Sequence, residues 1–371
     1  MKLSRLGEFI EQIEGRNKEG KFGVPFVRGI STKKEFISTK ADMEGVSIYS
    51  YKIVSPQQFA YVADTSRRGE KISLAYNDSD QPFLVSSITT VFHIRQEKLS
   101  DLHPLYLYIY LSRPEFDRYS RFNSWGSARE AFTWESMCEI DVFIPSIAIQ
   151  MKYVEVYNAL VANQKAYELG LNDLKLVSDA YIEELRRKCP VQAIGKHIEQ
   201  VIMMNKSCEI TNIKGVSASE GFIETKANMI DIDLAKYQIV LEGCFAFTPT
   251  RINIGSIALY KGEPCIVSPF YEVFRVKSNT LISDYLLIWL KRNEFYRYTL
   301  FKSDGNIRQT FDYYGMTEVE IPIPDVEVQR AIANVYIAFE KRKQINERLK
   351  KQIANVCPIL IKGSIEEAIR G

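Results

Sequence analysis

Two arginines in matching glycine-containing segments are the residues of this sequence best suited to binding chemistry. The segments read Gly126-Ser-Ala-Arg129 and Gly305-Asn-Ile-Arg308. A glycine lets the backbone approach a ligand closely, and an arginine can bind a phosphate or a guanine through two hydrogen bonds. The alternative is that each arginine ties its segment to its own domain. Because both segments share the arginine, a phosphate contact or a structural role is favoured over the reading of a particular base.

Motifs for other chemistry are missing from the sequence. It has no Gly-x-x-x-x-Gly-Lys-Ser/Thr loop, no Gly-x-Gly-x-x-Gly fingerprint, no Gly-x-Ser-x-Gly elbow and no His-Glu-x-x-His motif. The six cysteines form no Cys-x-x-Cys pair, and the three histidines (His93, His103 and His197) are not clustered. We therefore expect no metal site and no catalytic residue, and interpret the cysteines as reduced packing residues.

Length and composition indicate a folded protein of about two domains. The chain has 371 residues, of which 46% are hydrophobic and 25% charged. No apolar run is long enough to span a membrane, and the N-terminal segment does not resemble a signal peptide, so a cytoplasmic location is expected. The net charge is only +2, so any basic surface must come from segregation of charge rather than from an excess.

An internal repeat organises the chain. Residues 6–13 (LGEFIEQI) return at 194–201 as IGKHIEQV, and YLYIYLSRPEFDRYSRF at 106–122 returns at 285–301 as YLLIWLKRNEFYRYTLF. The matches keep their order while the offset changes from 188 to 179, as duplication followed by loop trimming would produce. The chain is therefore two copies of one unit.

Each copy follows the same order of elements. Short strand-like runs such as SIYSYKIV and FLVSSITTVFHI come first, and the aromatic helical segment follows. The glycine-containing segment, an Ile-Pro end and a long helix complete the copy. The aromatic residues of 106–122 and 285–301 recur at helical spacing, so we interpret them as core residues.

The long helical segments carry apolar seams at alternating spacings of four and three, as in coiled coils. The first seam consists of Tyr153, Tyr157, Leu160, Gln164, Tyr167, Leu171, Leu174, Ser178, Tyr181 and Leu185, and the weaker second seam consists of Val335, Ala338, Ile345, Leu349, Val356 and Ile359. A long helix with one apolar stripe needs a partner, which favours pairing of the two helices over packing of each on its own globule. The sequence therefore predicts an α+β fold in which two repeated mixed α/β globules are separated by two long helices, packed as an antiparallel coiled-coil-like spacer.

Each long helix is predicted to stop at a Cys-Pro pair, because proline disfavours helix at the residue before it. The pairs are Cys189-Pro190 and Cys357-Pro358. Counted from Pro145 and Pro324, the helical segments then measure 44 and 33 residues, so the second is expected to be three turns shorter.

Taken together, these features resemble the specificity subunits of type I restriction-modification systems, over essentially the whole chain. The resemblance depends on the duplicated domains, the long helices, the Leu6-Gly-x-x-Ile-Glu start and the Ile-Pro…Gln junctions at 144–150 and 321–329. It implies a target-recognition domain at 1–147, a spacer helix at 148–189, a second target-recognition domain at 190–325 and a second spacer helix with a tail at 326–371. The short second helix would depart from the family pattern.

The resemblance also implies partners. Each target-recognition domain would read one half of a bipartite, gapped site on double-stranded DNA. The helices would set the gap and dock two methyltransferase subunits, which restriction or translocase subunits can join. S-adenosylmethionine would be bound by the methyltransferase subunits, and this chain would hold no cofactor.

Exposed basic and polar residues of the globules are the candidate DNA contacts, since cations bind phosphates and polar side chains read base edges. They are Arg28, Lys33, Lys34, Arg67, Arg68, Lys71, Arg121, Trp125 and Arg129 in the first copy and Lys214, Arg251, Asn253, Lys261, Lys302, Asn306 and Arg308 in the second. Base readers should differ between the copies, which favours Thr65–Arg68 against Thr250–Asn253 and Ser124-Trp125 against Ser303-Asp304. The alternative for these pairs is ordinary drift of loop sequence.

A protein of another class remains open. The long helices could scaffold an assembly without touching DNA, which would explain the near-neutral charge. It would not explain why the two globules keep their framework while their loops diverge.

Overall fold

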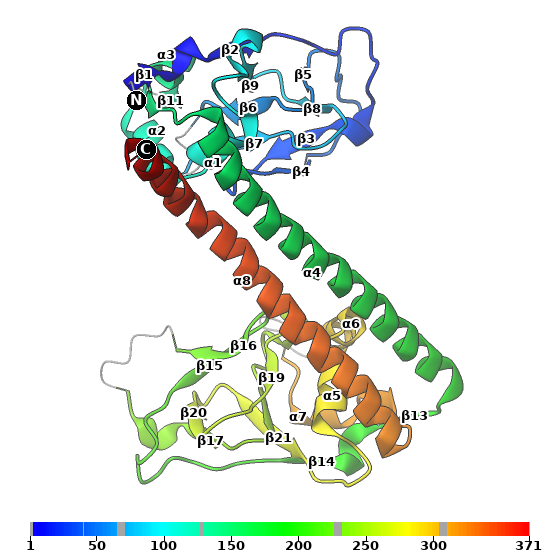
Figure 1. The fold of residues 1–371 in the computed structure, drawn as a ribbon. Helices are drawn as coiled ribbons and strands as arrows, with labels where there is room; N and C mark the ends of the chain where they lie inside the picture. Colours follow the sequence, from blue (N-terminus) through cyan, green and yellow to red (C-terminus); the bar gives the residue numbers. More distant parts are fainter. Residues whose placement is uncertain are drawn as a thin grey trace. The chain divides into compact units, whose positions relative to one another are not determined.

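The computed structural model describes residues 3–39, 41–64, 71–126, 130–225, 232–303 and 310–370. The chain divides into two compact units (Figure 1). Unit 1 contains Met1–Tyr167 and Ile345–Gly371, and unit 2 contains Glu168–Gln344. Each unit therefore combines one copy of the repeat with parts of both long helices. This division cuts across the four consecutive segments expected from the sequence, whose boundaries stay a prediction.

Unit 1 is built on a four-stranded antiparallel sheet with the strand order β2-β9-β6-β7. Its strands are β2 (Ile10–Ile13), β9 (Thr90–Ile94), β6 (Phe59–Val62) and β7 (Ser73–Tyr76). The smaller antiparallel pairs are β1 (Leu3–Arg5) with β12 (Asp141–Phe143), β3 (Arg28–Ile30) with β4 (Phe36–Ser38), β5 (Lys52–Val54) with β8 (Phe83–Val85), and β10 (Ser124–Trp125) with β11 (Ala131–Phe132). The short helices are α1 (Pro104–Leu111), α2 (Pro114–Phe122) and α3 (Trp134–Cys138).

Unit 2 repeats this topology. Its four-stranded sheet has the order β14-β21-β18-β19, with β14 (Ile198–Gln200), β21 (Glu272–Val276), β18 (Cys244–Phe247) and β19 (Ile257–Leu259). The smaller pairs are β13 (Val191–Ala193) with β22 (Glu320–Pro322), β15 (Lys214–Ser217) with β16 (Gly221–Glu224), and β17 (Gln238–Val240) with β20 (Cys265–Val267). The short helices are α5 (Ser283–Leu290), α6 (Asn293–Lys302) and α7 (Tyr313–Thr317). The predicted duplication is confirmed at the level of strand order.

The cores of the two units also match. Phe59 stacks on Phe92 with ring centroids 4.9 Å apart, and the equivalent Phe245 stacks on Phe274 at 4.8 Å. Each stacked pair lies on the central sheet, within a cluster that includes the buried aromatic residues of the first short helix. Stacked aromatic rings bury a large apolar area and prefer this separation, so each core is centred on the same pair.

A glutamine fastens the start of each long helix to its globule. The helices are α4 (Ile147–Lys188) and α8 (Val326–Arg370). Gln150 donates to the carbonyl oxygens of Asp101 (2.7 Å) and Pro145 (2.8 Å) and accepts from the backbone N–H of His103 (2.9 Å). Gln329 repeats this with Thr280 and Pro324 (both 2.7 Å) and Ile282 (2.9 Å). The glutamine of the Ile-Pro…Gln junction is therefore a buried clamp.

The two long helices pack against each other in opposite directions within each unit. In unit 1 the early part of α4 contacts the late part of α8: Lys152 pairs with Glu367, and the Gln164 amide donates to Asn346 Oδ1 at 2.9 Å. In unit 2 the late part of α4 and the early part of α8 share one core, which contains Ile182 and Ile332. The predicted antiparallel pairing and the α+β class are confirmed.

Most of the predicted seam positions lie in these contacts. Tyr157, Gln164, Leu171 and Leu185 are buried, and the remaining predicted seam residues of α4 are half-buried with one exception. The half-buried seam residues are Tyr153, Leu160, Tyr167, Leu174 and Ser178 in α4 and Val335, Ile345, Leu349 and Val356 in α8.

The exception is Tyr181, which is 48% exposed while its neighbour Ile182 is fully buried. A straight α-helix drifts by about 20° per heptad from a strict seven-residue repeat, or ~80° over the four heptads from Tyr153. The interface therefore passes from the predicted line of residues to the adjacent one. In α8, Ala338 and Ile359 of the predicted seam are likewise exposed.

The second long helix does not stop at Cys357-Pro358. Helix α4 ends at Lys188 as predicted, whereas α8 continues through Pro358 to Arg370, so the helices have 42 and 45 residues. A proline inside a helix costs about 3 kcal/mol. Beyond it, α8 buries Leu360 and Ile361 in the core of unit 1, and full burial of such a side chain contributes roughly 1.5–3 kcal/mol. Burial therefore outweighs the proline, and the expected short second helix was wrong.

Candidate nucleic-acid interface

Five of the predicted DNA contacts lie outside the described residues. They are Arg67, Arg68, Arg129, Asn306 and Arg308. The roles assigned to the two shared arginines and to Thr65–Arg68 therefore stay predictions.

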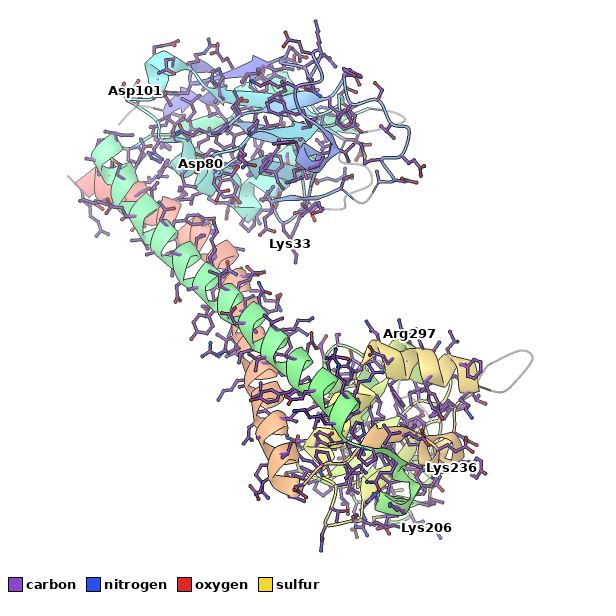
Figure 2. All side chains as sticks on the ribbon, turned by 90° about the vertical axis from the view of Figure 1, so that its right-hand side faces the viewer. Lys33, Asp80, Asp101, Lys206, Lys236 and Arg297 are labelled. Atoms are coloured by element: carbon purple, nitrogen blue, oxygen red, sulfur yellow. The ribbon has the colours of Figure 1, made fainter. Side chains whose placement is uncertain are left out.

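Among the described candidates of unit 1, four side chains are exposed: Lys33, Lys71, Arg121 and Trp125. Figure 2 shows Lys33 at the surface of unit 1. Trp125 is 69% exposed and lies on β10, directly before the glycine-containing segment that ends at Arg129. Arg121 pairs with Glu130, at the other end of that segment. All four side chains are thus exposed, and Arg121 is already paired with a carboxylate.

Arg28 and Lys34 are held by unit 1 itself. The Arg28 guanidinium donates to the carbonyl oxygens of Pro25 (2.7 Å) and Val27 (2.9 Å) and lies over the Phe83 ring. Lys34 is 5% exposed, and its ammonium pairs with Asp117 at 2.5 Å. Burial lowers the pKa of Lys34, while Asp117 acts in the opposite direction. The prediction that Lys34 is an exposed DNA contact was wrong, because its charge is compensated inside the fold.

In unit 2, Arg251 and Asn253 lie on a compact, fully described segment between β18 and β19. Ser256 N–H donates to the Arg251 carbonyl oxygen at 3.2 Å, and Arg251 N–H donates to that of Thr248 at 3.0 Å. Ile252 between the two candidates is buried, so the short 3₁₀ turn of Ile252–Ile254 is anchored. Arg251 is exposed and Asn253 is half-buried. The structure thus presents Arg251 on a hydrogen-bonded turn with a buried anchor.

Three other basic candidates in the described part of unit 2 form ion pairs. Lys214 pairs with Glu224 across the β15–β16 hairpin, Lys261 with Asp284 at 2.6 Å, and Lys302 with Glu318 at 3.4 Å. Surface ion pairs contribute only about 0–1 kcal/mol, so a phosphate could displace the carboxylate. Their basic charge is nevertheless locally balanced, as the near-neutral composition indicated.

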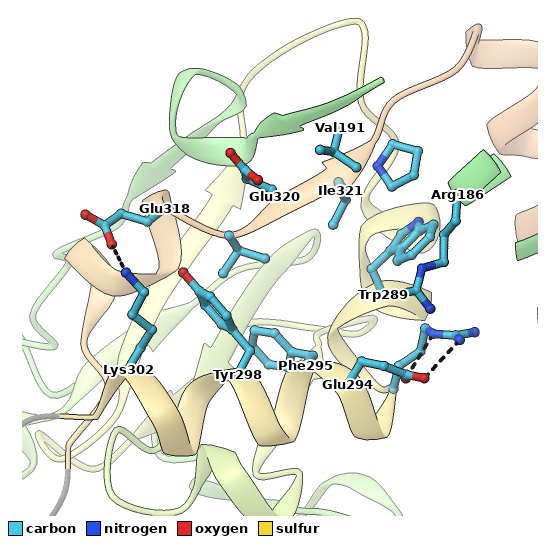
Figure 3. A pocket seen from close by; sticks show the side chains of 13 residues that line it. Arg186, Val191, Trp289, Glu294, Phe295, Tyr298, Lys302, Glu318, Glu320 and Ile321 are labelled. Carbon is cyan, nitrogen blue, oxygen red and sulfur yellow. Dashed lines mark hydrogen bonds and ion pairs between the residues drawn. The ribbon is translucent and has the colours of Figure 1, made fainter. Parts of the chain in front are cut away.

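A pocket of about 700 Å³ beside α6 illustrates this balance (Figure 3). Its aromatic wall contains Trp289, Phe295 and Tyr298. Its charged lining consists of the cations Arg186, Arg292 and Lys302 and the anions Glu294, Glu318 and Glu320. Arg292 pairs with Glu294 and Lys302 pairs with Glu318, so these two cations of the pocket lie beside carboxylates of opposite charge.

Two exposed residues shared by the copies were not singled out from the sequence. Arg118 and Phe122 occupy one face of α2 at a spacing of four residues, and Arg297 and Phe301 occupy the same positions on α6. Phe122 is 77% exposed and Phe301 85%. The interpretation of these two aromatic residues as core residues was therefore wrong. Figure 2 shows Arg297 at the surface of unit 2. Their repetition in RYSRF and RYTLF was the signal that could have revealed them.

The histidines have structural contacts. His93 Nε2 lies 2.8 Å from Glu11 Oε1, and the His103 ring accepts from the backbone N–H of Leu105 at the start of α1. Burial lowers the pKa of His103. The described ranges contain no group of three or more His, Cys, Asp or Glu side chains placed to bind a metal ion.

The cysteines of the described residues are free thiols, and three of them are buried. Burial raises the pKa of Cys357 to about 11, which keeps it protonated. Among the described helices, none combines the length and apolar character needed to cross a membrane.

The fold and the exposed residues define a class of protein with two repeated α/β units, each joined to the same pair of long helices. Residues 212–355 match the family model described as "Type I restriction modification DNA specificity domain". The putative type I restriction enzyme MjaX specificity subunit of Methanocaldococcus jannaschii is 26% identical over 174 residues. That alignment spans 42% of this chain and 40% of the relative.

A solved structure shares the fold over nearly the whole chain. It is the type I restriction-modification system S subunit from M. genitalium, with a TM-score of 0.62 and 9% identity over 98% of this chain and 95% of that one. The sequence matches and the shared fold are thus both to type I restriction-modification specificity subunits.

Proposed function

We propose that this chain is the DNA sequence-specificity subunit of a type I restriction-modification complex. Each unit reads one half of a bipartite, gapped target, and the paired helices set the spacing and dock methyltransferase subunits. The observation that carries the proposal is a duplicated framework with different reading segments. Strand order, stacked core and glutamine clamp are repeated. The segment that leads into the last strand of each four-stranded sheet, β7 in unit 1 and β19 in unit 2, differs in sequence between the units and is called the reading segment.

The different segments support two independent readers. In unit 2 the segment from Thr248 to Gly255 carries Arg251 and Asn253 on a compact turn. The matching stretch of unit 1 contains Thr65–Arg68. Lys71 follows them and is the first residue of this stretch from which the structure again describes the chain. Arginine and asparagine are suited to guanine and adenine edges, respectively, in the major groove. Units that kept one framework and diverged here would read different half-sites.

The chain supplies recognition, and the chemistry belongs to its partners. S-adenosylmethionine binds to the methyltransferase subunits, and restriction or translocase subunits complete the complex. The family assignment and the DNA specificity domain support DNA as the common ligand.

Co-expression with a type I methyltransferase subunit tests this function. Methylation of the host's genomic DNA would be mapped by long-read sequencing. We expect one gapped motif, of which one half changes when residues 1–145 are replaced by those of another family member. A stable complex that methylates no sequence, or a motif unchanged by the replacement, would favour the scaffold function.

A further inference from the structure

In each unit a lysine ammonium group contacts the carbonyl oxygen at the same point of the repeat. The sheet register establishes the equivalence, because Tyr61 pairs with Leu74 in unit 1 and Phe247 pairs with Ile257 in unit 2. Two residues before these partners, at the end of each reading segment, stand Ile72 and Gly255. Both carbonyl oxygens accept from a lysine.

In unit 1 the lysine comes from the turn between β3 and β4. Lys34 Nζ donates to the Ile72 carbonyl oxygen at 3.0 Å and to Asp117 Oδ1 of α2 at 2.5 Å. The same Asp117 oxygen accepts from the backbone N–H of Ile72 at 3.2 Å. The end of the reading segment is thus held on both its donor and its acceptor side.

In unit 2 the lysine comes from the helix pair and not from the hairpin turn. Lys291 follows α5, and its Nζ donates to the carbonyl oxygens of Gly255 at 3.3 Å and of Ala218 at 3.2 Å. Ala218 lies in the turn between β15 and β16, the counterpart of the turn that carries Lys34. Tyr296 of α6, which occupies the position of Asp117 in the repeat, packs against Gly255.

Both lysines therefore join the same three parts: the hairpin turn, the helix pair and the end of the reading segment. They do so from positions that do not match in the repeat, since Lys34 aligns with Glu220 and Lys291 with Ser112. Desolvation makes a buried ammonium unfavourable, and burial lowers the pKa of both lysines. Two different lysines in the same place indicate that a charged donor is needed at this carbonyl group.

Gly255 adds a second constraint at the same point. Its φ of +90° lies in the left-handed region that favours glycine, and a Cβ there would lie 2.9 Å from the Tyr296 hydroxyl. Arg251 precedes it by four residues and is bonded to Ser256 directly after it. The orientation of Arg251 is therefore coupled to the position of the Gly255 carbonyl group.

We propose that Lys34 and Lys291 are positioning residues for base recognition, each holding the end of one reading segment so that its side chains meet one half-site. The proposal rests on the proposed function. It assigns no DNA contact to either lysine. Loss of the ammonium group would let the segment shift, and a side chain displaced from a base edge no longer distinguishes that base.

The test compares Lys291→Met and Lys34→Met in the co-expressed methyltransferase complex, with methylation of host genomic DNA as the readout. Lys291→Met is expected to lower discrimination by about tenfold, the contribution of one well-oriented base contact, in one half of the motif only. Lys34→Met is expected to do the same in the other half. Lys206→Met, at an exposed lysine of unit 2, serves as the matched control and should leave the motif unchanged.

A general loss of folding would lower methylation at all sites without changing the preference between half-sites. If Lys291→Met fails to assemble, Gly255→Ala displaces the same carbonyl group while keeping the lysine, and the same half of the motif should relax. The proposal is overturned if assembled variants keep the wild-type motif, or if both halves relax equally. Absence of any gapped motif in the wild type would instead refute the proposed function.

Discussion

The two units share one framework but place their internal charges differently. Both clamp the long helix with a buried glutamine and centre the core on stacked phenylalanines. At the end of the reading segment, unit 1 uses the buried pair Lys34–Asp117, whereas unit 2 uses Lys291 with backbone carbonyl groups and Tyr296. Duplication thus preserved the framework and the place of a contact, while the residues that make it changed.

The largest expected difference between the units concerns position 117 and its counterpart 296. Asp117→Ala would leave the Lys34 ammonium buried without its carboxylate, which costs about 3–5 kcal/mol of folding free energy. Tyr296→Phe, which removes a hydroxyl with no ionic partner in unit 2, should change stability by less than about 0.5 kcal/mol. Denaturant unfolding of the full chain measures both. Equal losses in the two variants would show that the Lys34–Asp117 ion pair contributes no more to stability than the Tyr296 hydroxyl group.

The glutamine clamps should instead behave alike. Gln150→Ala and Gln329→Ala each remove three hydrogen bonds, or about 3 kcal/mol at ~1 kcal/mol for each bond. The measurement is the unfolding midpoint of each variant. A large loss for one glutamine and none for the other would contradict the structural equivalence of the two helix starts.

The polar pair between the long helices distinguishes unit 1 again. Gln164 and Asn346 are buried in the helix seam, whereas their counterparts in the repeat are Lys343 and Tyr167. Asn346→Leu should cost about 1–3 kcal/mol, because it removes the acceptor of a buried amide. The double variant Gln164→Leu with Asn346→Leu should return to within ~1 kcal/mol of the wild type. A double-mutant cycle by thermal unfolding checks this, and additive losses would argue against the pairing.

The smallest expected effect is a pH dependence at the start of α1. Because burial lowers the folded-state pKa of His103 below its ordinary 6.5, the unfolded chain takes up the proton first as the pH falls. Stability is therefore lost from about pH 6.5 downwards until the folded pKa is reached. His103→Asn keeps a capping side chain and should reduce this loss by less than ~1 kcal/mol. The free energy of unfolding of the variant and of the wild type is measured at pH 7.5 and 5.5. If both proteins lose the same stability between the two pH values, His103 does not titrate in this range.

Several features of the fold could be predicted from the sequence because they repeat within it. The duplication, the mixed α/β units, the long helices and their antiparallel pairing follow from matched segments and from heptad spacing. Tyr157, Gln164 and Leu171 were placed correctly because the helical period is local. Tyr181 was not, since the small difference between 3.5 and 3.6 residues per turn accumulates along the helix.

The candidate site could be predicted less well, because residue type does not reveal where a charge is compensated. Lys33 and Lys34 are adjacent lysines in the sequence, yet one is exposed and the other pairs with a carboxylate 83 positions away. Phe122 looked like its neighbours in an aromatic helix but lies outside the core.

By itself, the sequence determined the number of copies and the order of their elements, since these depend on patterns along the chain. Only the tertiary structure decided that α8 passes through Pro358, because the burial that offsets the proline comes from the core of unit 1. It also decided that Lys34 serves the fold, because a buried ammonium group is stable only where distant segments bring an acceptor to it.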